Sequence, residues 1–330
     1  PVVKNVRVKA LAQWVSDVTG NRNGLVPLPV EASARRFYRT TLGERSVVVM
    51  DAPPDTEDNA HFVALSNCFR HAEVSVPEVL ASDLEQGFLL VEDFGDNLLE
   101  RTYGLGQDDK VLGLALAMLV RIQGISDPII PAYTTERFTA ELGIFRKWVL
   151  QDLIGVSTVP FDDVIDFLVR TCDTQPKVTI HRDFHCRNLL LKSNGTIGAV
   201  DFQDALVGPI SYDLASILYD CYYQFSDATI ATSIARYLQL AREAGHSTTD
   251  DEEDFTRALE ITAVQRQLKA VGIFARLKLK QDRASHLENI VPVMRRVCEL
   301  MTKHRELVAC AKWLETTTLH PIRDAVARLR

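Results

Sequence analysis

Two acidic side chains and one amide stand at spacings that would let them act together. The segment "KVTIHRDFHCRNLLL" places Asp183 and Asn188 in one loop, and Asp201 ends the strand-like segment "GTIGAVD". The Asn194-Gly195 pair between them predicts a hairpin that brings Asp201 beside the loop. A carboxylate can orient a hydroxyl and accept its proton, and further hard oxygen atoms suit Mg²⁺. The set therefore predicts phosphoryl transfer from a nucleotide to a hydroxyl.

Each of these residues has a distinct expected role. Asp183 is the expected general base, while Asn188 and Asp201 are the expected Mg²⁺ ligands. The spacing H-R-D-x-x-x-x-N is typical of a kinase catalytic loop. A simpler alternative is that His181 and Asp183 only hydrogen-bond a loop. The predicted hairpin and the strand ending at Asp201 favour the functional interpretation.

Composition limits the partners. The 330 residues are 46% hydrophobic and carry a net charge of -7, which argues against a nucleic-acid binder. The apolar run Val111–Val120 is too short to span a bilayer, and the start lacks a signal-peptide pattern. Six scattered cysteines suit a reducing compartment. We expect a cytoplasmic protein that binds small molecules, without a nucleic acid, a membrane or an obligate protein partner.

The remaining pattern predicts two lobes. After an opening helix, the first ninety residues are expected to be strand-rich, with hairpins at Gly43-Glu44 and near Gln86-Gly87. A strand-rich island at 177–202 interrupts an otherwise helical second part. Helical spacing marks the segments 109–124, 135–154, 161–172, 211–226, 227–244, 251–277 and 284–303. The prediction is an α+β protein with a small antiparallel-sheet lobe, 1–95, a hinge near 90–95 and a larger helical lobe, 96–330.

The motifs "HRDFHCRNLLL", "GAVDFQDALVGP" and "SYDLASIL" resemble those of the aminoglycoside phosphotransferase and choline kinase superfamily. The resemblance implies a bilobal protein-kinase-like fold that uses ATP and Mg²⁺. It also implies that His181 supports the catalytic loop and that Asp213 braces it from the following helix. A protein kinase is disfavoured, because His185 stands where its loop would have Lys and the Gly of D-F-G is missing after Asp201. The chain is expected to pass directly into a helix, so a small acceptor is predicted.

The phosphate-binding part of the small lobe departs from that family. The turn 30–39 has no glycine-rich motif, although its small residues, including Ser33, could let backbone N–H groups approach phosphate. Met50 stands where the third strand of a kinase carries Lys. Arg35 or Arg36 could compensate, or they could be solvated arginines on a plain hairpin. Without compensation, the chain would be a nucleotide-binding regulator rather than an enzyme.

A narrower resemblance supports the interpretation that another residue compensates for the missing lysine. The segments "EASARRFYR", "VVVMDAPPD" and "AVQRQLKAVGIFARL" are similar to those of the anomeric sugar kinases that act on N-acetylmuramate and N-acetylglucosamine in cell-wall recycling. These kinases also have Met-Asp-Ala-Pro-Pro in place of the lysine. The resemblance implies phosphorylation of the anomeric hydroxyl to give a sugar 1-phosphate. An aminoglycoside or choline kinase is the rival within the enzyme class.

The remaining candidate residues are those expected to bind the adenine base of the nucleotide and the acceptor molecule. Backbone groups of Glu92, Asp93 and Phe94 are expected to pair with the base in a hinge. The expected acceptor contacts are polar side chains near the catalytic loop or on the segment 265–280. They are Arg182, Gln203, Asp204, Arg266 and Lys269. Asp204 could instead cap a turn, and Arg182 could face solvent.

Overall fold

The computed structural model of this chain describes residues 2–20, 24–29, 34–248 and 251–329. Ser33, one of the predicted phosphate contacts, lies outside these residues. The chain forms two compact units: unit 1 comprises residues 1–97 and 190–203, and unit 2 comprises residues 98–189 and 204–330. This division differs from the predicted 1–95 and 96–330 because a short stretch from the middle of the chain joins unit 1.

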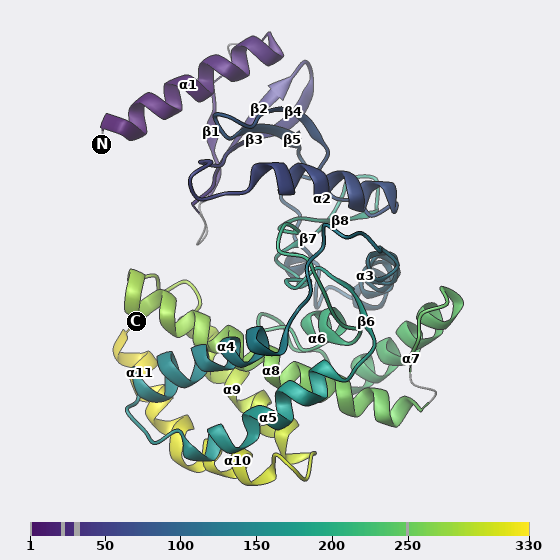
Figure 1. Cartoon of the computed structure of the whole chain (residues 1–330), viewed down its shortest axis with the longest axis vertical. Helices are drawn as coiled ribbons and strands as arrows, with labels where there is room; N and C mark the ends of the chain where they lie inside the picture. The colour runs from purple at the N-terminus through teal and green to yellow at the C-terminus, as the bar shows by residue number, and fades with distance from the viewer. Residues whose placement is uncertain (1, 21–23, 30–33, 249–250, 330) are drawn as a thin grey trace. The chain divides into compact units, whose positions relative to one another are not determined.

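Unit 1 contains a five-stranded antiparallel sheet in the order β1-β2-β3-β5-β4 (Figure 1). The predicted hairpins are confirmed, with Gly43 at φ +61° and Gly87 at φ +71°. Both values lie in the left-handed region that glycine adopts without strain. The strands are β1 (Val26–Pro27), β2 (Arg36–Leu42), β3 (Arg45–Asp51), β4 (Val79–Asp83) and β5 (Phe88–Glu92).

The two faces of this sheet have different roles. Helix α1 (Val2–Thr19) buries Leu11 and Val15 against one face, which Val49 and Leu90 share. Met50 pairs with Phe37 and Leu89 in the strand register, so these three belong to the other face. Figure 1 shows α1 and a second helix, α2 (Asn59–His71), on opposite sides of the strands.

Helix α2 is a correction to the strand-rich prediction for the first ninety residues. Asp58 caps it by accepting the backbone N–H of His61 at 2.9 Å. Phe62, Leu65 and Phe69 are buried at helical spacing. The helix lies between strand-like runs on either side, and its apolar residues at helical spacing were the available signal.

The predicted hairpin of the middle island is confirmed. Strands β7 (Leu189–Leu191) and β8 (Ile197–Ala199) pair with each other, and Gly195 has φ +80° in the turn. Phe202, three residues after β8, packs its ring 5.0 Å from that of Phe62 and 5.7 Å from that of Phe69 on α2. This aromatic contact helps to fix the end of the hairpin within unit 1.

Unit 2 is helical around a two-stranded sheet of β6 (Lys177–Ile180) and β9 (Leu206–Pro209). Strand β9 is a correction, because the chain was expected to run straight into a helix after Asp201. The predicted helix 211–226 is also too long, since it ends at Leu218. The helices are α3 (Asp108–Gln123), α4 (Thr135–Phe145), α5 (Val159–Asp173), α6 (Tyr212–Leu218), α7 (Asp227–Glu243), α8 (Glu252–Gln281), α9 (Leu287–Thr302), α10 (Val308–Trp313) and α11 (Leu319–Leu329), with shorter helical turns at Leu99–Arg101, Arg146–Gln151 and Leu314–Thr318.

Helix α8 forms the centre of unit 2. It packs against α4, α5, α6 and α9, and most of its middle part is buried. Burial on several sides explains why its sequence shows little amphipathic pattern. Among the residues that the structure describes, none of the helices combines the length and apolar character needed to cross a bilayer.

The close approach of α8 to α4 yields a stability prediction. A Cβ added to Gly272 of α8 would lie 2.6 Å from the backbone nitrogen of Phe145. Gly272→Ala should therefore lower the free energy of unfolding by about 1–3 kcal/mol, because the helices must separate. Gly143→Ala, on α4 with open space at its Cβ, is the matched control. It should raise the free energy of unfolding by about 0.5–1 kcal/mol in denaturant titrations, and similar effects for both variants would contradict the packing argument.

Candidate active site

The predicted catalytic loop begins directly after β6 and is held by a buried carboxylate. Asp213, in the first turn of α6, accepts the backbone N–H groups of His181 at 2.6 Å and Arg182 at 3.0 Å. Burial raises the pKa of Asp213 to about 7 despite these two hydrogen bonds. Arg182 has φ +76°, a conformation that side-chain-bearing residues adopt only when their surroundings impose it. The structure thus places Asp213 where it fixes the strained start of the loop.

A second carboxylate holds the other half of the loop. Asp220 accepts the backbone N–H of Cys186 at 2.9 Å and that of Tyr222 at the same distance, and it is 3% exposed. Asp220 was not among the residues predicted from the sequence. Its signal was weak: an aspartate seven residues after Asp213, at the end of an apolar helix. The loop from 181 to 186 is therefore anchored at both ends through its backbone.

Asp183 projects from this loop into a strongly positive environment. Its carboxylate is 37% exposed and lies 3.9 Å from the Nη2 atom of Arg266. Burial alone would raise the pKa of Asp183, but Lys269, His185, Arg266 and Arg182 together hold it well below its ordinary value. Asp183 is therefore ionised at neutral pH.

Glu141 is a buried carboxylate beside the loop that was not among the residues predicted from the sequence. Its carboxylate, on α4, lies 3.0 Å from Arg182 and 3.4 Å from Lys269, and it accepts a hydrogen bond from the hydroxyl of Tyr133. Glu141 is only 6% exposed. Its position among Phe138, Leu142 and Phe145 on the apolar face of α4 was the available signal, because a charged residue there must be paired.

The structure brings most of the predicted acceptor residues of unit 2 together. Arg182, Arg266 and Lys269 are each less than 9% exposed, and Asp183 contributes to the electrostatic environment of all three. Asp204 has a largely exposed side chain whose carboxylate is 3.9 Å from Nη1 of Arg182. Arg182 does not face open solvent, since its guanidinium is committed to Glu141.

The two predicted metal ligands are suited to Mg²⁺ by their chemistry. The amide nitrogen of Asn188 donates to the backbone oxygen of Asp183 at 3.0 Å, which fixes the orientation of the amide. Asp201, at φ +64°, accepts a hydrogen bond from Gln203 at 2.5 Å. An amide oxygen and a carboxylate, completed by nucleotide phosphates, are a normal Mg²⁺ environment. Within the described ranges, no three His, Cys, Asp or Glu side chains gather as a metal site of their own.

Asp201 and Gln203 belong to unit 1, whereas Asp183 and Asn188 belong to unit 2. The predicted convergence of Asp201 with the catalytic loop therefore stays a prediction.

The predicted hinge residues are held by side-chain contacts within unit 1. Asp93 accepts hydrogen bonds from Arg39 at 2.6 Å and from Ser46 at 2.5 Å. Burial would raise its pKa, but these bonds and that from Gly95 lower it below its ordinary value. Glu92 lies 3.3 Å from Arg45. A cavity of about 610 Å³ runs beside Asp93 and Phe94.

The antiparallel sheet of unit 1, the helical unit 2 and the anchored H-R-D loop define a kinase-like phosphotransferase. The chain belongs to the Phosphotransferase enzyme family, whose pattern matches residues 24–251. Solved structures share the fold at low sequence identity. Choline kinase LicA from Streptococcus pneumoniae has a TM-score of 0.65 at 11% identity, covering 88% of this chain and 98% of that one. Ethanolamine kinase from Plasmodium vivax has a TM-score of 0.64 at 13% identity, covering 88% and 87%. The predicted bilobal α+β fold is confirmed.

Curated relatives are more similar in sequence. The chain is 35% identical to an N-acetylmuramate/N-acetylglucosamine kinase of Pseudomonas aeruginosa, over 88% of this chain and 87% of that protein. It is 32% identical to a protein of the same name from Neisseria meningitidis, over 90% and 92%. The predicted resemblance is therefore confirmed in both its broad and its narrow form.

The buried charges at Glu141 yield a second prediction. Glu141→Gln should lower the free energy of unfolding by about 3 kcal/mol, because Arg182 and Lys269 would remain buried without their counter-charge. Glu136→Gln is a control on the exposed face of the same helix and should cost only a few tenths of a kcal/mol, about the value of one charge near a helix start. Equal midpoints in urea for both variants would show that the Glu141 contacts are not stabilising.

Proposed function

We propose that this protein is an ATP-dependent kinase that phosphorylates the anomeric hydroxyl of N-acetylmuramate, N-acetylglucosamine or both. The product would be the sugar 1-phosphate, and the role would be recycling of peptidoglycan sugars in the cytoplasm. The supporting observation is the ionised Asp183 on its anchored loop, in a chain 30–35% identical to three proteins named for these two sugars. Solved relatives of the same fold contain AMP or ADP, which supports the choice of nucleotide.

In this proposal, Asp183 orients the acceptor hydroxyl by accepting its hydrogen bond. The hydroxyl oxygen attacks the γ-phosphorus, the bond from that phosphorus to the bridging oxygen breaks, and ADP departs. The proton moves to Asp183. Because its pKa is low, Asp183 is a weak base, and the proton transfers late in a loose transition state. Mg²⁺ held by Asn188 and Asp201 would neutralise charge on the phosphates.

The charge balance around the loop supports an acceptor that is neutral or negative. The cations Arg182, Arg266 and Lys269 are all buried, whereas only one of the three carboxylates that they directly approach is buried: Glu141, but not Asp183 or Asp204. Arg266 and Lys269 are proposed to contact the sugar, and a carboxylate such as the lactyl group of N-acetylmuramate would complement them. Asp204 and Gln203 are proposed as further acceptor contacts, and Arg182 as a more buried one.

The same balance disfavours the rival acceptors. An aminoglycoside or choline brings positive charge, which the cations of α8 would repel. Several solved structures of this fold that are named for choline, ethanolamine or aminoglycosides are only 11–16% identical to this chain. They support the fold and leave the acceptor open to experiment.

The substrate proposal is tested with a panel of acceptors. The wild-type protein should consume ATP with N-acetylmuramate or N-acetylglucosamine, and the product should lose its reducing end and show a phosphate on C1 by ³¹P NMR. Asp183→Asn should lower kcat by about 10²–10⁴-fold, because the general base is lost while the shape of the side chain remains. ATP binding without turnover on any sugar, choline or aminoglycoside would favour a regulator, and phosphate on an aminoglycoside would favour the rival enzyme.

The position of Lys269 yields a pH prediction. Lys269 is the strongest of the charges that lower the pKa of Asp183, so the wild-type profile of kcat/KM should stay flat on the acid side down to a pH below the ordinary range of an aspartate. Lys269→Met removes that charge, raises the pKa of Asp183 and should move the acid limb to higher pH. Lys280→Met, at an exposed position of the same helix, should leave the limb in place. An unmoved limb in Lys269→Met would contradict this electrostatic account.

A further inference from the structure

The sheet of unit 1 has a buried Met50 at the position where a kinase carries a phosphate-binding lysine. Met50 is 1% exposed and has no charge to offer. A nucleotide site built on this sheet therefore needs a cation from another element on the same face of the sheet.

The direction of the side chains along the sheet distinguishes the two arginines that could replace the missing lysine. Arg36 lies opposite Asp51 in the register, on the face that packs against α1. Arg35 directly precedes the first residue of β2, and continued alternation of the chain places it on the other face, with Met50. Its guanidinium lies over the ring of Phe62, 5.6 Å from the ring centroid, which places it beside α2. Only Arg35 of the pair shares the face of the missing lysine.

Arg35 is held by a carboxylate. Its Nη2 atom lies 2.7 Å from Glu57, and the two side chains are only 10% and 15% exposed. A guanidinium presents five N–H donors in a planar fork, so it can bind a carboxylate along one edge and a phosphate along another. A lysine paired with a glutamate serves this purpose in protein kinases. Here an arginine and a glutamate would form the pair, and they would stand at other positions in the chain than the lysine and glutamate of protein kinases.

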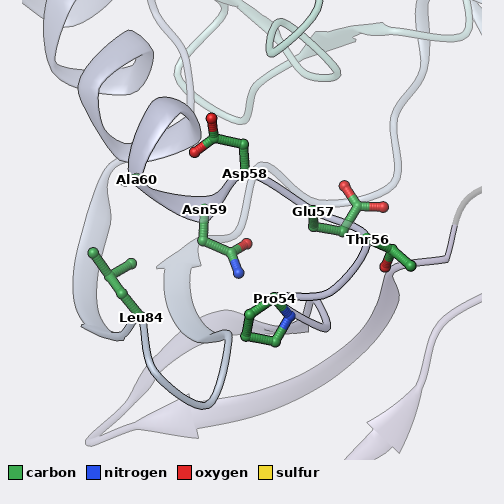
Figure 2. Close-up of a pocket in the computed structure, with 7 residues that line it drawn as sticks. All are labelled: Pro54, Thr56, Glu57, Asp58, Asn59, Ala60 and Leu84. Atoms are coloured by element: carbon green, nitrogen blue, oxygen red, sulfur yellow. The ribbon is translucent and has the colours of Figure 1, made fainter.

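The segment "MDAPPD" explains how Glu57 reaches this position. The carbonyl of Pro53 accepts the backbone N–H groups of Thr56 and Glu57, each at 3.0 Å. The buried amide of Asn59 donates to the carbonyl of Ala52 at 2.8 Å. Figure 2 shows Thr56, Glu57 and Asn59 around a hollow of about 480 Å³, with Asn59 directed toward Pro54. The prolines and this amide form a compact turn that fixes Glu57 just before α2.

The proposed metal ligand lies close by in the same unit. Phe62, under the guanidinium of Arg35, packs 5.0 Å from the ring of Phe202, and Phe202 directly follows Asp201. Arg35 and Asp201 therefore flank one pair of aromatic rings that pack in a tilted contact. Phosphates bound through a metal at Asp201 would come within the neighbourhood of the Arg35 guanidinium.

We propose that Arg35 binds the phosphate groups of the nucleotide in place of the absent strand lysine, and that Glu57 is the positioning residue that holds it. This inference rests on the proposed ATP-dependent function but not on the identity of the acceptor. It gives the "MDAPPD" segment a role: it delivers the carboxylate that orients the arginine.

The experiment measures nucleotide binding without any acceptor. Arg35→Gln should weaken the binding of Mg²⁺ with a non-hydrolysable ATP analogue by about 10- to 100-fold, the range expected for charge-assisted contacts to phosphate. Binding of adenosine, which has no phosphate, should not change. Arg35→Lys should restore part of the loss. Arg36→Gln is the matched control on the opposite face and should bind both ligands as the wild type does.

Glu57 is tested by a separate readout. Glu57→Gln should raise the KM for ATP while leaving the KM for the sugar unchanged, and Glu57→Asp should recover part of the effect. Thermal unfolding of each variant identifies any general loss of structure. Unchanged ATP binding in Arg35→Gln, or equal weakening of ATP and adenosine in a folded variant, would overturn the inference. If the wild type binds ATP through Arg35 yet phosphorylates no sugar, the proposed substrate fails and the inference stands.

Discussion

The backbone hydrogen bonds from the catalytic loop to Asp213 and Asp220 are the constraint on which the rest of the site depends. Asp213 fixes the N–H groups of two successive residues and so maintains the left-handed conformation of Arg182. That conformation sends the Arg182 side chain to Glu141 and leaves Asp183 to project from the loop. Asp220 fixes the far end at Cys186. Because these contacts use backbone N–H groups, the loop can be held without using the side chains that are proposed to perform chemistry.

The electrostatics of unit 2 follow from that geometry. Buried cations stabilise the ionised form of Asp183. The carboxylate therefore stays deprotonated at neutral pH, and it is a weak base. Glu141 offsets part of the same positive charge and allows Arg182 and Lys269 to remain buried. Such an arrangement suits phosphoryl transfer, in which positioning and charge stabilisation contribute more than proton abstraction. In unit 1, the Arg35–Glu57 pair lies beside Phe62, and the ring of Phe62 packs against that of Phe202, the residue after Asp201.

Local patterns predicted those parts of the structure that depend on local interactions. The strand-like runs around Gly43 and Gly87 and the Asn194-Gly195 turn predicted the strands and hairpins, because strand propensity and turn chemistry act over a few residues. Helix α2 was not predicted, although its N-cap and its buried face follow ordinary patterns, because strands precede and follow it in the sequence. Strand β9 was missed for a different reason. Four residues pair with β6, which lies about thirty positions earlier, and no local pattern specifies that partner.

The sequence by itself predicted the candidate reacting groups and indicated the phosphotransferase family and the absence of a third-strand lysine, since each is a matter of residue type and spacing along the chain. The tertiary structure decided which charges meet. Glu141 approaches Arg182 across forty-one positions of sequence, and Asp220 meets the backbone of Cys186 across thirty-four. The separation of Arg35 from Arg36 was also tertiary, because Arg36 begins β2, whereas Arg35, just before the strand, lies over Phe62 of α2. Which side holds α2 and Glu57 is decided only when the sheet and helices pack together.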